Sequence, residues 1–174
     1  MQALLVIDVQ NGIVNNGDFT DELTKMEHLI KDFKKSNNPV IFMQHVDEVE
    51  GSPLQKNTDG VALHPSLRNY ADHVMEKQTP SSFFQTKLEA ILTKMEVEHL
   101  FIIGFNTEFC CMFTAIAAFD RGYKVTLIED ATGTVNTDTT YEMKGLDIRD
   151  FVGTVLHWSD VIEVQDFDEY QHLS

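Results

Sequence analysis

The strongest constraint on the fold of this chain is a regular alternation of short apolar segments with longer segments of helical periodicity. The apolar segments are rich in β-branched and aromatic residues, which is typical of strands in a parallel sheet covered on both faces. We therefore expect four buried strands, at residues 3–7, 40–44, 100–103 and 124–128.

Apolar residues recur at helical spacing between these strands. Helices are expected over residues 23–33, 84–95 and 108–121. Residues 152–156 and 161–164 are expected to add a helical turn and a last strand, and the acidic tail from Asp166 is expected to lie on the surface.

Strands that alternate with helices predict right-handed crossovers and a layered α/β fold. The expected architecture is a three-layer α/β/α sandwich with a mainly parallel, doubly wound, Rossmann-like sheet of about six strands. The chain has 174 residues with no repeat and no linker, so residues 1–174 are expected to form a single domain.

Charge and composition limit the partners. The chain carries 28 acidic and 13 basic residues, a formal net charge of −15, which would repel nucleic acid and an anionic membrane surface. No apolar stretch approaches the roughly 20 residues of a membrane helix, and the chain starts without a basic leader or cleavage site. We expect a cytoplasmic protein that acts on a small neutral or cationic substrate.

The two cysteines, Cys110 and Cys111, are adjacent. Neighbouring Cα atoms lie about 3.8 Å apart, so a disulfide between them would be strained. Two interpretations remain open: a pair of buried thiols, or one activated thiol beside a packed one.

Reactive residues follow two of the expected strands. Asp8 follows the first strand directly, and residues 104–110 follow the strand at 100–103. Because ligand sites of parallel sheets lie at the carboxyl ends of the strands, we expect Asp8 and Cys110 at the same edge.

Three sequence segments carry a family resemblance: LLVIDVQ at residues 4–10, KQTPSSF at 77–83 and GFNTEFCCMFTAIAA at 104–118. In this order they resemble the isochorismatase-like cysteine hydrolases, and residues 122–131 extend the similarity to nearly the whole chain. Each segment alone is a weak signal, whereas all three in the family's order are specific for this family.

The resemblance implies a catalytic triad of Asp8, Lys77 and Cys110. Cys110 would attack a carbonyl group and form a thioester, Lys77 would supply positive charge, and Asp8 would move the proton. A cysteine at a helix N-terminus beside a cation is expected to have a lowered pKa. The alternatives are a buried small residue for Cys110, a helix cap for Asp8 and a surface ammonium for Lys77.

The resemblance also implies a cis peptide bond between Phe105 and Asn106. The backbone N–H groups of Asn106 and Cys110 would then form an oxyanion hole. Aromatic residues near the pocket are expected to line it, although core packing is the more common role of such residues. The candidate substrate-binding residues are Gln10, Phe19, Phe83, Phe84, Phe105, Asn106 and Phe109.

Some relatives that hydrolyse nicotinamide hold a metal through an Asp and several His residues. Here His45, Asp47 and His64 are the nearby candidates, and their spacing departs from that pattern. We therefore expect no metal and no other cofactor, which argues against nicotinamide as substrate. Residues 47–64 are expected to form a long mobile loop over the pocket.

The function predicted from sequence is hydrolysis of a small amide or carbamoyl C–N bond through a Cys110 thioester. One alternative is hydrolysis of a vinyl ether, which needs no cysteine nucleophile. Another is a catalytically silent α/β binding domain, although residues 8–14 lack a G-x-G-x-x-G loop. Family members are commonly oligomers, so a homodimer is expected, with residues 112–119 and the 122–123 turn at the interface.

Overall fold

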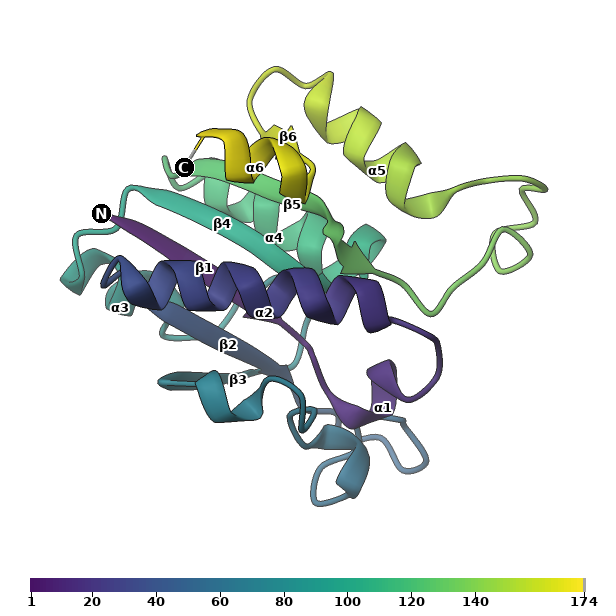
Figure 1. Ribbon diagram of the computed structural model, residues 1–174. Helices are drawn as coiled ribbons and strands as arrows, with labels where there is room; N and C mark the ends of the chain where they lie inside the picture. Colours follow the sequence, from purple (N-terminus) through teal and green to yellow (C-terminus); the bar gives the residue numbers. More distant parts are fainter. Residues whose placement is uncertain (174) are drawn as a thin grey trace.

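The computed structural model describes residues 1–173 and shows one six-stranded sheet between two layers of helices (Figure 1). All strand pairs are parallel, and the strand order is β3-β2-β1-β4-β5-β6. This confirms the expected α/β class with a doubly wound sheet. The strands are β1 (Gln2–Ile7), β2 (Val40–His45), β3 (His73–Lys77), β4 (His99–Phe105), β5 (Lys124–Gly133) and β6 (Glu163–Gln165).

Helices cover both faces of the sheet. Helices α2 and α6 pack on the face turned to the viewer in Figure 1, and α4 lies behind the sheet. Helices α3 and α5 contribute to the same core cluster as α4. The helices are α1 (Asn11–Val14), α2 (Thr20–Lys35), α3 (Leu88–Lys94), α4 (Met112–Phe119), α5 (Ile148–His157) and α6 (Phe167–Leu173), with a π-helical turn at Thr107–Cys111 and 3-10 turns at Asp59–Val61 and Arg68–Tyr70.

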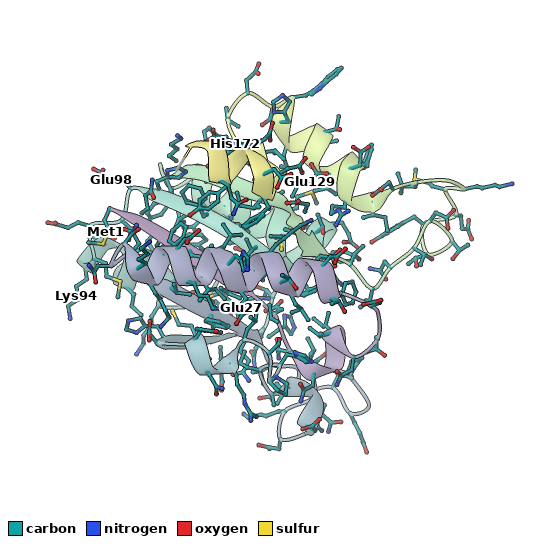
Figure 2. The ribbon with its side chains drawn as sticks, in the orientation of Figure 1. Met1, Glu27, Lys94, Glu98, Glu129 and His172 are labelled. Atoms are coloured by element: carbon teal, nitrogen blue, oxygen red, sulfur yellow. The ribbon has the colours of Figure 1, made fainter. Side chains whose placement is uncertain are left out.

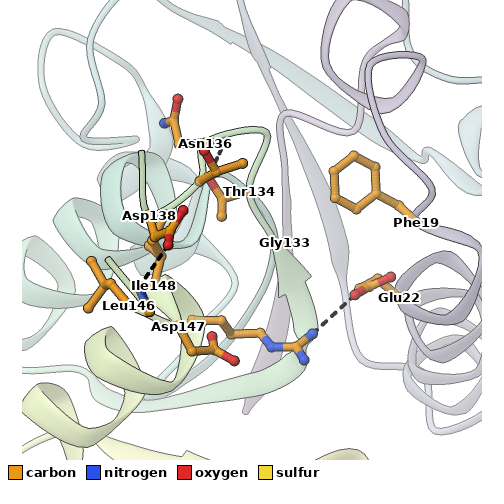
Figure 3. A pocket seen from close by; sticks show the side chains of 12 residues that line it. Phe19, Glu22, Gly133, Thr134, Asn136, Asp138, Leu146, Asp147 and Ile148 are labelled. Carbon is orange, nitrogen blue, oxygen red and sulfur yellow. Dashed lines mark hydrogen bonds and ion pairs between the residues drawn. The ribbon is translucent and has the colours of Figure 1, made fainter. Parts of the chain in front are cut away.

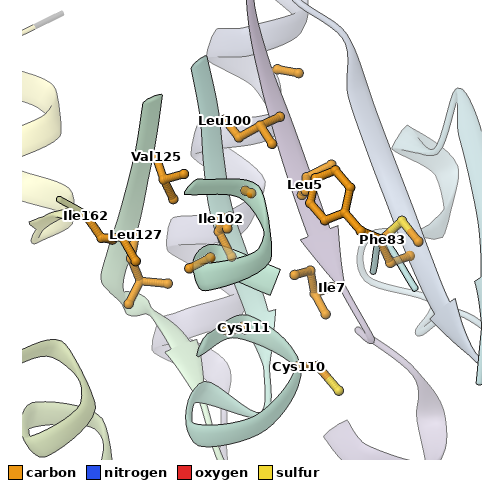
Figure 4. Packing of buried hydrophobic residues seen from close by; sticks show 14 of the residues in the cluster. Leu5, Ile7, Phe83, Leu100, Ile102, Cys110, Cys111, Val125, Leu127 and Ile162 are labelled. Carbon is orange, nitrogen blue, oxygen red and sulfur yellow. The ribbon is translucent and has the colours of Figure 1, made fainter. Parts of the chain in front are cut away.

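The core divides according to the alternation of side chains along the strands. In β1, Leu5 and Ile7 point to the α3, α4 and α5 side, whereas Leu4 and Val6 point to the α2 side. Figure 4 shows Leu5 and Ile7 in the core cluster on the α3, α4 and α5 side. Because both faces of the central strands are buried, these strands read as continuous apolar runs.

The amino ends of the strands form one edge of the sheet. Met1 and Glu98 lie near each other there (Figure 2), with the terminal ammonium 3.9 Å from the Glu98 carboxylate. The carboxyl ends form the opposite edge, where Gly104 brings β4 close to β1. Gly104 has φ +119°, and a Cβ atom there would collide with the backbone oxygen of Ile7, so only glycine fits.

Several elements differ from the sequence expectations. Strand β3 was not expected, and the acidic tail, expected on the surface, forms α6 instead, with Phe167 and Tyr170 buried against the core. Helix α3 begins at Leu88 rather than at Phe84, because Gln85 has a positive φ of 56° and breaks the helix there. Helix α5 and strand β5 are longer than expected.

Helix α4 exposes an apolar face. We call Phe113, Ile116 and Phe119 the α4 stripe; their exposed fractions are 47%, 44% and 40%. The helix contains no charged residue. None of the helices within residues 1–173 combines the length and the apolar composition that crossing a membrane requires.

Candidate active site

Three side chains from distant parts of the chain meet at the carboxyl edge of the sheet. Asp8 follows β1, Lys77 ends β3, and Cys110 lies in the π-helical turn after β4. Lys77 Nζ is 2.7 Å from Asp8 Oδ2 and 3.2 Å from Cys110 Sγ. The structure therefore brings together the three residues that the sequence predicted as a triad.

Strand register fixes these positions. In the pairing of β2 with β3, His45 lies opposite Lys77, and in the pairing of β1 with β4, Ile7 lies opposite Gly104. Asp8 has a φ of 51°, a left-handed conformation that Asp tolerates better than most residues. Its N–H donates to the Met43 carbonyl at 3.0 Å, which ties the chain after β1 to β2.

Lys77 is a buried cation with a full set of acceptors. Besides Asp8 and Cys110, its Nζ donates to the Thr79 carbonyl at 3.2 Å and to His45 Nδ1 at 3.1 Å. Burial lowers the pKa of Lys77, but Asp8 and Cys110 raise it more, so the net pKa lies above its ordinary value. The ammonium therefore stays charged at neutral pH.

The pKa of the Cys110 thiol differs from the sequence expectation. We expected a lowered pKa, but burial and the neighbouring Asp8 raise the pKa of Cys110 to about 12, against the opposing effect of Lys77. The thiol is 9% exposed and close to a carboxylate, so desolvation dominates. Cys110 is thus a neutral thiol at rest and needs a base when it attacks.

Asp8 can supply that base. Its Oδ2 binds Lys77, while its Oδ1 is buried and has no hydrogen-bond partner among residues 1–173. A buried carboxylate oxygen without a donor carries a desolvation cost unless a ligand or a transferred proton satisfies it. Oδ1 is therefore free to accept a proton.

Gln10 and His45 support the same edge. The Gln10 side chain is buried, and its amide binds backbone atoms: Oε1 accepts from His45 N–H, and Nε2 donates to the carbonyls of His45 and Val61. Gln10 was expected to contact substrate, but its amide serves to fix the end of β2. His45 was considered only as a metal ligand, and its role beside Lys77 was missed.

Asn106 lies where the resemblance placed it. The Phe105–Asn106 peptide bond is cis. Asn106 Oδ1 accepts a hydrogen bond from Val135 N–H at 3.4 Å, which connects the residue to the segment after β5. The use of its own N–H in an oxyanion hole stays a prediction.

A cavity of about 500 Å³ opens beside Phe19, Gly133 and Thr134 (Figure 3). Phe19 packs edge-on against Phe105, which is itself fully buried, with 4.7 Å between ring centroids. Among the residues that line the cavity, Arg149 from α5 pairs with Glu22 from α2, with 3.0 Å between their charged atoms. Asp8, Lys77 and Cys110 do not line this cavity. Of the predicted substrate-binding residues, Phe19 does line it.

The other aromatic candidates lie elsewhere. Phe83 is buried in the core, where its ring stacks on Tyr123 and the Arg121 guanidinium lies over it. Phe83 thus packs in the core, and its expected contact with substrate stays a prediction. Phe84 and Phe109 are 54% and 40% exposed and sit at the surface.

Glu108 is a second buried carboxylate that sequence reasoning missed. Its Oε1 accepts hydrogen bonds from Thr134 Oγ1, Asn136 Nδ2 and Tyr141 OH at 2.7 to 3.0 Å. Burial and Glu108 raise the pKa of Tyr141 to about 12. Glu108 thus ties the segment after β5 to the π-helical turn that carries Cys110.

The residues considered for a metal do not converge. His64 Nδ1 bonds to Ser66 Oγ, and Asp47 Oδ1 accepts from the Val49 N–H. His45 does come within 4.8 Å of ligand atoms of Asp8 and Cys110. However, the Lys77 ammonium lies among those three atoms and already supplies a positive charge, so these residues do not fit a metal ion.

A Rossmann-like α/β sandwich that gathers a thiol, an ammonium and a carboxylate at the carboxyl edge of its sheet has the features of a hydrolase. The family model of the isochorismatase domain matches residues 2–160. The chain therefore belongs to the isochorismatase family.

Individual relatives agree with this assignment. The chain is 34% identical over 141 residues to the uncharacterized isochorismatase family protein YddQ of Bacillus subtilis, covering 76% of this chain and 77% of that protein. It is 29% identical over 163 residues to Nicotinamidase 3 of Arabidopsis thaliana, covering 78% and 75%. The structure of N-carbamoylsarcosine amidase from Thermoplasma acidophilum superposes with a TM-score of 0.77 at 22% identity and 97% coverage of both chains, which shows the shared fold.

Proposed function

We propose that this protein is a cysteine hydrolase that cleaves the C–N bond of a small amide or carbamoyl compound through a thioester on Cys110. The observation that carries the proposal is the position of Lys77 Nζ, 2.7 Å from Asp8 and 3.2 Å from Cys110 Sγ. A thiol that needs a base, a free carboxylate oxygen and a fixed cation are the groups that such a reaction uses.

In the acylation step, Sγ attacks the substrate carbonyl carbon while the thiol proton passes to Asp8 Oδ1. The S–C bond forms and the carbonyl oxygen becomes negative, where the N–H groups of Asn106 and Cys110 would stabilise it. When the tetrahedral intermediate collapses, the C–N bond breaks and Asp8 returns the proton to the leaving nitrogen. The amine or ammonia leaves, and the acyl group stays on sulfur.

In the deacylation step, a water molecule attacks the thioester carbonyl and gives a proton to Asp8. The C–S bond breaks, the acid or carbamic acid leaves, and the sulfur recovers the proton from Asp8. Lys77 stabilises the negative charge that develops on sulfur in both steps, because its ammonium is fixed at 3.2 Å.

The relatives support a C–N bond as the target. The names of Nicotinamidase 3 and N-carbamoylsarcosine amidase describe enzymes that act on an amide and on a carbamoyl compound. The acidic chain, with a net charge of −15, favours a neutral or cationic substrate over an anionic one.

The test is ammonia release from a panel of small amides and carbamoyl compounds. For any substrate that is turned over, Cys110→Ala should lower kcat by about 1,000-fold or more, as removal of a nucleophile does. Cys111→Ala is the matched control: this thiol is fully buried next to Cys110, and its loss should change kcat only a few-fold. Mass spectrometry of the enzyme with a slow substrate should detect an acyl adduct.

Unchanged activity in Cys110→Ala would rule out the thioester and favour acid–base hydrolysis of another bond, such as a vinyl ether. Turnover of no member of the panel, together with no acyl adduct, would favour a silent binding domain.

A further inference from the structure

The ring of His45 faces the ammonium of the candidate site. His45 ends β2 opposite Lys77, and its Nδ1 is 3.1 Å from Lys77 Nζ. An ammonium group only donates hydrogen bonds, so Nδ1 must be the acceptor and the ring must carry its proton on Nε2. The ring is therefore neutral when it makes this contact.

Gln10 holds the backbone that carries this ring. Its Oε1 accepts from His45 N–H at 2.8 Å, and its Nε2 donates to the His45 carbonyl at 2.9 Å. Gln10 itself is 0% exposed. Because one buried side chain holds both backbone groups of His45, the backbone that carries the ring is fixed without substrate.

Lys77 depends on its acceptors for direction. The lysine stem is flexible, and three N–H bonds must be shared among four atoms: Asp8 Oδ2, His45 Nδ1, Cys110 Sγ and the Thr79 carbonyl, all within 3.2 Å. Asp8 and Cys110 change their protonation during the proposed reaction, so the strength of their hydrogen bonds to the ammonium changes too. His45 is the side-chain acceptor that stays the same.

We propose that His45 is a positioning residue that holds the Lys77 ammonium between Cys110 and Asp8, and that it does so only as a neutral imidazole. This inference rests on the proposed function for the role of Lys77. It assigns to His45 no contact with the reacting atoms of the substrate.

The charges around His45 give the proposal a pH dependence. The groups that face the ring are Lys77 from β3, Asp8 from the end of β1, Cys110 from the π-helical turn and Asp47 beyond β2. Burial and Lys77 lower the pKa of His45, and Asp8 and Asp47 oppose this shift. Protonation would place a second cation 3.1 Å from the ammonium, so the reactivity of Cys110 should fall in acid, below the ordinary histidine pKa of about 6.5.

The test is the rate at which iodoacetamide alkylates Cys110 between about pH 5 and 8, in a Cys111→Ala background that leaves one thiol. His45→Ala removes the acceptor and should slow alkylation near pH 7 by roughly 10- to 100-fold. His45→Asn keeps an acceptor oxygen close to the position of Nδ1 without a titrating ring. It should alkylate near the parent rate at pH 7 and keep more of that rate at pH 5.

His99→Asn is the matched control, because His99 is another partly buried histidine, at the amino end of β4. It should leave the alkylation profile unchanged. Lys77→Met shows how far the alkylation rate falls when the ammonium is lost completely. Circular dichroism checks that each variant is folded.

The outcomes separate the two proposals. If Lys77→Met alkylates as fast as the parent, the proposed function fails, because the ammonium does not act on the sulfur. If Lys77→Met is slow but His45→Ala is not, or if His45→Asn is as slow as His45→Ala, the role of His45 is overturned. If His45→Ala does not fold, His45→Asn still tests the role of His45. If the alkylation rate of His45→Asn falls towards pH 5 as steeply as that of the parent, the proposal is overturned.

Discussion

The buried ion pair between Asp8 and Lys77 predicts a large coupling in stability. Its charged atoms are 2.7 Å apart, and the two side chains are 1% and 0% exposed. Removing one partner of such a pair leaves a buried charge uncompensated, which costs about 3–5 kcal/mol, whereas replacing both partners by neutral groups is often close to neutral. Lys77→Met and Asp8→Asn should each lower the free energy of unfolding by about 3–5 kcal/mol.

The double variant should lose less than about 2 kcal/mol, because neither charge remains. In a chain of this size 1 kcal/mol shifts Tm by about 2–4 °C, so each single variant should melt roughly 10 °C lower than the wild type. The double variant should melt higher than either single variant. This inversion is specific to a buried pair, since an exposed pair contributes about 1 kcal/mol or less.

The assay is urea unfolding followed by circular dichroism at neutral pH. Trp158 is 80% exposed, so its fluorescence reports poorly on the core. The pKa of Lys77 is raised, so the stability that its charge contributes is fully present below the ordinary lysine pKa of 10.5 and is lost as the pH rises through the folded-state pKa. Single variants within about 1 kcal/mol of the wild type, or a double variant that loses the sum of both, would refute the reasoning.

Two further predictions concern the remainder of the molecule. Burial and Lys124 lower the pKa of His99 to about 4, so its neutral form stabilises the fold above about pH 6.5, and this stability is lost as the pH falls towards 4. Since the ring is only half-buried, we expect an effect of about 1–2 kcal/mol on the free energy of unfolding. When the pH is lowered from 7.5 to 5, the Tm of His99→Gln should therefore fall less than the Tm of the wild type. An equal fall in Tm would contradict this prediction. We also propose that the α4 stripe packs against a second copy of the chain, as uncharged exposed aromatic faces often do. Light scattering should then give a dimer for the wild type and for the surface control Lys94→Glu but a monomer for Ile116→Glu, and a wild-type monomer would rule the interface out.

Sequence reasoning located the central strands well for a physical reason. Strands β1 and β4 are buried on both faces, so their apolar runs are continuous and easy to detect. Asp8 and Cys110 could be placed at one edge because the carboxyl ends of parallel strands meet there. The motif resemblance was still needed to add Lys77, since nothing in its local pattern marks it.

The elements that sequence reasoning missed have weak local signals. Strand β3 has the sequence HVMEK, and only its last residue is buried, so it lacks the pattern of a core strand. Helix α6 is acidic and is fixed by the burial of Phe167 and Tyr170 against distant residues. In both segments tertiary packing determines the structure, and local propensity does not reveal it.

The chemistry of Cys110 shows a similar limit. Its place at the start of a helix beside a lysine suggested a lowered pKa, which is the usual result at a solvated helix terminus. The actual shift depends on burial and on the distance to Asp8, neither of which a linear pattern contains. The contribution of His45 was hidden for the same reason, because it arises from the register between β2 and β3.

Strand β3 determines how the site will fail. It lies at the margin of the sheet, where it pairs only with β2 within residues 1–173, yet it ends in the lysine that contacts Cys110 and Asp8. Marginal strands detach at a lower free-energy cost than central ones. We therefore expect heat or denaturant to separate Lys77 from Asp8 and Cys110 before the central strands unfold.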